Sequence, residues 1–174
     1  MNNTRFVILF LVRATAVYML WLIFYDLWML KVGWLDNFII DNLVGFTKNI
    51  LTILGYKLFV YEHTIGVDGS HGVYIGVPCS GVELMALFAG FVVIFKGNIV
   101  HKVWFIILGV VVIHFLNFLR VVSLTLIAHY HPEVLDFNHK YTFTIFLYII
   151  VFFGWMIWVR YFSVNYKQKT DLVV

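Results

Sequence analysis

The chain has 174 residues, of which 63% are hydrophobic and 12% are charged, and its mean hydropathy is +0.94. A charged fraction about half that of a soluble domain excludes a soluble globular protein, because a chain of this size cannot bury so much apolar surface. The formal net charge of +3 comes from basic residues that flank apolar runs, which excludes a nucleic-acid partner and is typical of membrane proteins.

The first apolar run covers residues 6–30 and predicts a transmembrane helix. It is too long for the core of a cleaved signal and has no small-residue cleavage site, so we expect it to remain as an anchor. Trp21 and Trp28 near its far end are typical of an interfacial belt. Arg13 and Asp26 are interpreted as anchors that reach opposite membrane surfaces.

Residues 38–60 have the pattern of an amphipathic helix. We expect this helix to lie on the membrane rather than to cross it. Apolar residues recur at helical spacing, namely Phe38, Ile39, Leu43, Phe46, Ile50, Ile53 and Leu54. Polar residues occupy much of the remainder of the stretch 31–60, namely Asp36, Asp41, Asn42, Lys48 and Asn49.

Residues 61–78 are rich in glycine, with valine and isoleucine between, and predict an outer hairpin or paired loop. Asp68-Gly69 is a typical tight-turn sequence. The polar residues of this segment match no known metal-ligand spacing and are interpreted as solvated loop residues, namely Glu62, His63, Asp68 and His71. No metal and no cofactor are predicted.

Three further apolar runs predict transmembrane helices, over 79–95, 103–128 and 141–162. The fold class is therefore an all-α polytopic membrane protein, a single domain with about four spans. The amino terminus, the turn at 96–102 and the tail at 163–174 are basic, so both termini are predicted to be cytoplasmic. The polar loop at 129–140 then faces outward, as does the segment before residue 79.

Three residues from separate spans are candidates for chemistry at the outward side. Cys79, the only cysteine, lies at a helix start, where free N–H groups favour a thiolate. His139 precedes the last helix and is placed to move a proton. Arg120 lies within an apolar helix, about 12 Å of helix rise below its outer end, and can hold an oxyanion or a carboxylate. Together they indicate acyl transfer.

Two further residues are candidates for supporting roles. Glu83 lies one helical turn after Cys79 and is placed to pair with Arg120 or to orient His139. Asn117 shares a helix face with Arg120 and is placed to hold it or to contact substrate. Each candidate also has a structural interpretation: a packing cysteine, a capping histidine, an Arg120–Glu83 ion pair, and an ordinary interhelical hydrogen bond at Asn117.

Three sequence signatures resemble the exosortase/archaeosortase family: PCSGVELMALFAGF at 78–91, NFLR at 117–120 and FNHKYTF at 137–143. The chain is similar to small four-span members of the kind found in Bacteroidetes-type bacteria. The resemblance implies a membrane-embedded cysteine transpeptidase or protease. It also implies that Cys79 is the nucleophile, His139 the proton shuttle and Arg120 the stabiliser of the oxyanion or substrate.

The resemblance further implies the partners and the location of the enzyme. The substrate would be an exported protein with a carboxyl-terminal motif, a transmembrane helix and a basic tail. Cleavage would occur at the outer face of the bacterial cytoplasmic (inner) membrane through a thioester on Cys79. The acyl acceptor would be water or an amine on a lipid- or glycan-linked carrier.

Two other functions remain open from the sequence. One is a non-catalytic membrane assembly factor for envelope or polysaccharide export, which would not depend on Cys79. The other is a small transporter with Arg120, Glu83 and His114 along an ion path. The sequence contains no pair of discontinuous helices of the kind that transporters use.

Overall fold

The computed structural model describes residues 33–163 without a gap, together with residues 8, 12, 15, 16, 18–23, 25 and 27. The predicted first span over 6–30 lies outside the continuously described part, and the proposed anchors Arg13 and Asp26 are not described. Of the predicted tail over 163–174, only Ser163 is described.

The chain divides into two compact units. The first, here called the site unit, combines Gly33–Val82 with Ile113–Ile149. The second, here called the aromatic unit, combines Met1–Val32, Glu83–Val112 and Ile150–Val174. Each unit is built from segments that are distant in sequence, and the longest helix contributes to both.

Helix α3, Trp34–Ile53, buries one face and exposes an apolar stripe on another. It ends seven residues before the predicted boundary because Gly55 adopts a left-handed conformation, with φ of 88°. The backbone N–H groups of Gly55 and Tyr56 then donate to the carbonyls of Thr52 and Leu51, a common helix stop. The exposed apolar stripe consists of Trp34, Phe38, Phe46, Ile50 and Ile53.

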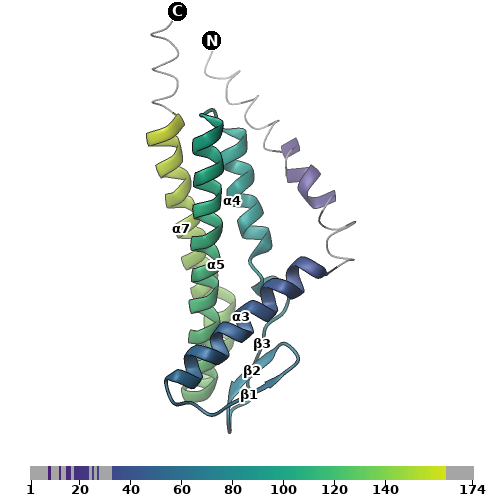
Figure 1. Ribbon diagram of the computed structural model, residues 1–174, viewed down its shortest axis with the longest axis vertical. Coiled ribbons are helices and arrows are strands. Elements are labelled where there is room, and N and C mark those ends of the chain that lie inside the picture. Colours follow the sequence, from purple (N-terminus) through teal and green to yellow (C-terminus); the bar gives the residue numbers. More distant parts are fainter. Residues whose placement is uncertain are drawn as a thin grey trace, which may run out of the picture. The chain divides into compact units, whose positions relative to one another are not determined.

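Three short antiparallel strands in the order β1-β2-β3 follow α3 (Figure 1). They are β1 (Leu58–Tyr61), β2 (Thr64–Val67) and β3 (Val73–Tyr74). Asp68 and Gly69 form the turn after β2, closed by a hydrogen bond from Ser70 N–H to the Val67 carbonyl at 2.9 Å. The segment predicted as a hairpin or loop thus forms a small sheet, which packs against α3.

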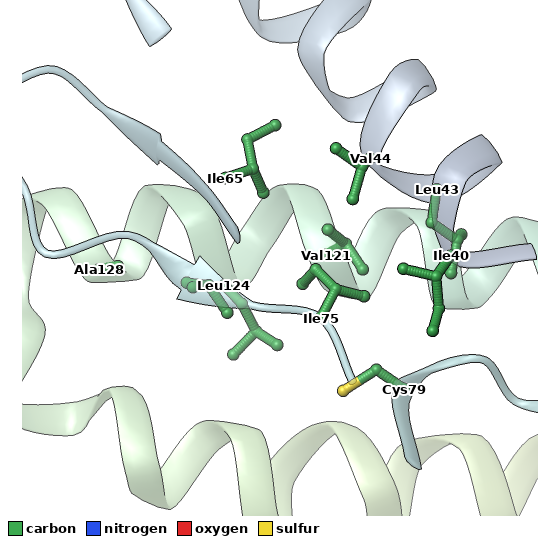
Figure 2. Close-up of a cluster of buried hydrophobic side chains, with 10 residues drawn as sticks. Ile40, Leu43, Val44, Ile65, Ile75, Cys79, Val121, Leu124 and Ala128 are labelled. Carbon is green, nitrogen blue, oxygen red and sulfur yellow. The ribbon is translucent and has the colours of Figure 1, made fainter. Parts of the chain in front are cut away.

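The core of the site unit lies between α3, the sheet and the second half of helix α5, Ile99–Tyr130. Figure 2 shows Cys79 at the edge of this cluster, next to Ile75. Branched aliphatic side chains dominate the contacts, and burial of this apolar area stabilises the unit. The members are Ile40, Leu43, Val44, Ile65, Val73, Ile75, Cys79, Val121, Leu124 and Ala128.

The segment after α5 is helical where the sequence predicts a polar loop over 129–140. It begins with a 3-10 turn, Pro132–Val134, and continues through Leu135–Phe137, the π-helical Asn138–Thr142 and helix α7, Phe143–Ile157. Proline and acidic residues suit the first turn of a helix, because its N–H groups lack acceptors. The polarity of this segment therefore marks a helix start.

Two helical segments of the described residues are long and apolar enough to cross a membrane, Ile99–Tyr130 and Pro132–Ser163. Only 22% and 17% of their most apolar windows is buried, unlike the core helix of a soluble protein. Helix α4, Val82–Ile94, is apolar but has only 13 residues. The described residues thus hold two membrane-length helices, fewer than the four spans predicted for the whole chain.

The aromatic unit is packed through rings and glycines. The Phe88 ring lies against Gly109 and Gly154, where an added Cβ would touch the ring. The rings of Phe91 and Trp155 stack with centroids 4.4 Å apart. Glycine in these helices therefore makes room for an inserted ring at the cost of some helix propensity.

Candidate functional site

The single cysteine lies in a tight turn that joins β3 to α4. Val77–Cys79 forms one 3-10 turn, in which the Cys79 N–H donates to the Gly76 carbonyl at 2.8 Å. Gly81 then adopts φ of 76°, so the α-helix begins at Val82 rather than at residue 79 as predicted. The Cys79 residue is 3% exposed, so the cysteine is buried.

The structure places His139 in contact with this cysteine. The Sγ atom of Cys79 lies 3.1 Å from Nε2 of His139. This distance is within hydrogen-bonding range for sulfur, and the tautomer of the ring decides which atom donates. A thiol and an imidazole 60 residues apart in sequence are thus paired directly.

Arg120 joins the pair through the backbone of residue 139. Its Nη2 atom donates to the His139 carbonyl at 3.1 Å, and the residue is 9% exposed. The turn between α5 and the next helix lies at His131, and that helix begins at Pro132. Measured along the two helices from His131, His139 is about 12 Å away and Arg120 about 16 Å away. The early helix start thus brings the two residues to similar depths. Within the described chain, the buried Nε of Arg120 has no hydrogen-bond partner.

Asn117 holds the cysteine turn from the same helix as Arg120. Its Nδ2 atom donates to the Cys79 carbonyl at 3.1 Å, and the residue is 1% exposed. The amide lies over Gly81, where a side chain would collide with it. Glycine is therefore required at position 81 both by its left-handed φ and by the close approach of Asn117.

Asp36 and Ser80 form a second attachment of this turn, which the sequence analysis missed. The Ser80 hydroxyl donates to Oδ1 of Asp36 at 2.6 Å, and both residues are almost fully buried. Ser80 Oγ also accepts from the Val82 N–H at 3.3 Å. A signal exists in the sequence: Asp36 precedes Ile40 by four and Leu43 by seven, which places it on the buried face of α3.

The structure does not test the other supporting candidate. Glu83 has an exposed side chain and belongs to the aromatic unit, so its role in assisting Arg120 or His139 stays a prediction. Among the described residues, no group of three His, Cys, Asp or Glu side chains is placed to hold a metal ion.

The assembled groups have complementary chemistry. The thiol can act as a nucleophile, the imidazole beside it can accept and return a proton, and the guanidinium can stabilise negative charge on oxygen. The Asn117 amide, which donates to the Cys79 carbonyl, holds the turn that carries the thiol. This combination suits transfer of an acyl group from an amide or ester.

Comparison with known proteins identifies the family of the chain. The family model described as transmembrane exosortase matches residues 5–158, which is most of the chain. No curated protein and no solved structure matches the sequence. The membrane-length helices Ile99–Tyr130 and Pro132–Ser163 are consistent with a membrane protein. By this match the chain belongs to the transmembrane exosortase family.

Proposed function

We propose that this protein is a membrane-embedded cysteine transpeptidase or protease that cleaves the carboxyl-terminal sorting signal of an exported protein. The observation that carries the proposal is the 3.1 Å contact between Cys79 Sγ and His139 Nε2, with Arg120 bound to the same residue 139. Membership of the transmembrane exosortase family supports a transpeptidase-like role in general.

In the first half of the reaction, His139 takes the proton of the Cys79 thiol. The sulfur attacks the carbonyl carbon of the scissile peptide bond, and a C–S bond forms. The resulting oxyanion develops near Arg120, whose buried Nε has no other partner in the described chain. His139 then returns the proton to the leaving amine as the C–N bond breaks, which leaves a thioester on Cys79.

In the second half, water or an amine attacks the thioester carbon. His139 removes a proton from this acceptor, the C–S bond breaks, and the thiol is regenerated. Water gives hydrolysis, and an amine on a lipid- or glycan-linked carrier gives transfer of the exported protein to that carrier. The near-complete burial of Cys79 supports transfer, because it limits access of bulk water to the thioester.

The substrate in this proposal carries a short motif, a transmembrane helix and a basic tail. Its helix docks in the bilayer beside the apolar helices of the enzyme and presents the motif at the outer boundary of the bacterial inner membrane. Basic segments keep both termini of the enzyme in the cytoplasm, and the cysteine turn then faces outward.

The experiment is co-expression of the full chain with an exported protein that bears such a signal. We expect wild-type protein to shorten the substrate and to form an acyl adduct on Cys79 that mass spectrometry detects. Cys79→Ala should abolish both, and Cys79→Ser should retain little activity, because a hydroxyl is a far weaker nucleophile than a thiol.

A matched pair of histidines tests the proton shuttle. His139→Ala should remove processing, while His131→Ala should not. The His131 side chain is 71% exposed, and the one ion pair it forms in the described chain is with Glu133. Normal processing by both Cys79 variants, with no adduct in wild type, would reject the enzyme and leave a membrane assembly factor.

A further inference from the structure

Asp36 is an acidic side chain in an unusual place, since only 2% of the residue is exposed. Burial of a carboxylate costs free energy unless hydrogen bonds compensate it. The Ser80 hydroxyl supplies one such bond at 2.6 Å, a length typical of a hydroxyl that donates to a carboxylate. The position of Asp36 in the first turn of α3 adds a favourable interaction with the helix dipole.

The bond from Asp36 fixes the orientation of the Ser80 hydroxyl. Because its hydrogen points to Asp36, its lone pairs are free to accept from the Val82 N–H, at 3.3 Å. Ser80 directly follows Cys79, so the exit of the turn is held from α3. Asn117 holds the Cys79 carbonyl from α5, and the Gly76 carbonyl holds the Cys79 N–H.

We propose that Asp36 is a positioning residue for acyl transfer, and that it acts through the Ser80 hydroxyl to hold the Cys79 thiol beside His139 and Arg120. The proposal rests on the proposed function and extends the catalytic apparatus to α3. Loss of the Asp36–Ser80 bond would free the turn on one side and displace the sulfur. A displacement of about 1 Å can lower the rate of an enzymatic step by about a hundredfold.

Two small reagents separate the position of the sulfur from its accessibility, in purified full-length protein in detergent micelles. With p-nitrophenyl acetate, the thiolate attacks the ester carbon through an oxyanion, the C–O bond breaks, and p-nitrophenolate leaves an acetylated Cys79. With iodoacetamide, the sulfur displaces iodide and no oxyanion forms. Because the chain has one cysteine, mass mapping of the Cys79 peptide follows both reactions.

We expect Asp36→Ala and Ser80→Ala each to slow acetylation of Cys79 by about tenfold to a hundredfold. The double variant should be no slower than the slower single variant, because both remove one interaction. Alkylation by iodoacetamide should slow less than acetylation, since it requires the thiolate but no stabilisation of an oxyanion by Arg120. Asp36→Asn keeps an acceptor oxygen and should restore most of the acetylation rate.

Two residues of α3 serve as matched controls. Asp41→Ala removes an aspartate whose side chain is 70% exposed, and Thr47→Val removes a polar group that is fully buried on the same face as Asp36. Both should acetylate at the wild-type rate. These controls separate loss of the Ser80 bond from loss of charge on the helix or of polarity in the core.

Three outcomes would count against the inference. Acetylation of Asp36→Ala at the wild-type rate would overturn it and leave the proposed function intact. Parallel loss of acetylation, alkylation and thermal stability in Asp36→Ala and Asp36→Asn alike would reduce Asp36 to a folding role. Failure of wild-type protein to acetylate at Cys79 while iodoacetamide still alkylates it would reject the proposed function, and this inference with it.

Discussion

The two units of the chain are packed in different ways. In the site unit, buried polar side chains are bonded to the backbone or to each other around one turn, as Asn117, Arg120 and Asp36 show. In the aromatic unit, rings fill space beside glycines, and two buried indole nitrogens, of Trp155 and Trp158, have no partner in the described chain. Hydrogen bonds therefore hold the turn where chemistry is proposed, whereas packing of rings beside glycines is prominent in the aromatic unit.

The largest effect should come from the charged member of the site. Arg120→Lys keeps the positive charge but removes the planar group that reaches the His139 carbonyl. We expect the acetylation rate of Cys79 to fall by about a hundredfold to a thousandfold, as for loss of an oxyanion donor. A rate within a few-fold of wild type would show that charge alone suffices at this position.

The next effect tests the turn itself. Gly81→Ala places a Cβ against the Asn117 amide and strains a left-handed residue. We expect a loss of about 1–3 kcal/mol in unfolding free energy, measured by thermal unfolding in micelles, together with slower acetylation. Gly45→Ala is the matched control, because an added Cβ there meets nothing within 4 Å. Equal unfolding free energies and equal acetylation rates in the two variants would contradict the requirement for glycine at position 81.

A glycine of the aromatic unit should affect stability without affecting chemistry. Gly109→Ala forces a Cβ into the Phe88 ring. Overpacking of this kind costs about 1–3 kcal/mol, so the unfolding midpoint should fall. The acetylation rate of the protein that remains folded should match wild type. A slower acetylation of Cys79 in the folded variant would show that packing in the aromatic unit affects the site unit. The two units would then not differ in their effect on chemistry.

The smallest effect concerns a buried hydroxyl in the site unit. Thr47 is fully buried, and its Oγ1 has no hydrogen-bond partner among the described residues. Thr47→Val removes this polar atom at nearly constant shape, so stability should be unchanged or should rise by about 1 kcal/mol. A clear loss of stability, again measured by thermal unfolding, would reveal a polar partner for Thr47.

The sequence predicts much of the site because its signals are local. Cys79 stands at the start of an apolar run, and Arg120 is conspicuous within another. The Asp68-Gly69 turn is likewise local. The turn between β1 and β2 gave no such signal, because Glu62 adopts a positive φ of 50°, which is uncommon for glutamate.

The pairing of Asp36 with Ser80 was beyond sequence reasoning. Asp36 and Ser80 are 44 residues apart, so nothing local pairs them. An aspartate on an amphipathic helix was interpreted as part of its polar side, although its spacing from Ile40 places it on the buried face. The polar run from Pro132 was similarly interpreted as a loop, because acidic residues suit both a loop and a helix start.

The contact between Arg120 and His139 does not involve the imidazole ring, which is the base in the proposed mechanism. Arg120 binds the main-chain carbonyl of residue 139 and not its imidazole ring. Replacement of His139 by a smaller residue would therefore leave this link in place and open a ring-sized vacancy beside the sulfur. Free imidazole added to such a variant should occupy that vacancy and recover part of the acetylation rate, because the Arg120 contact that holds residue 139 does not depend on the imidazole ring.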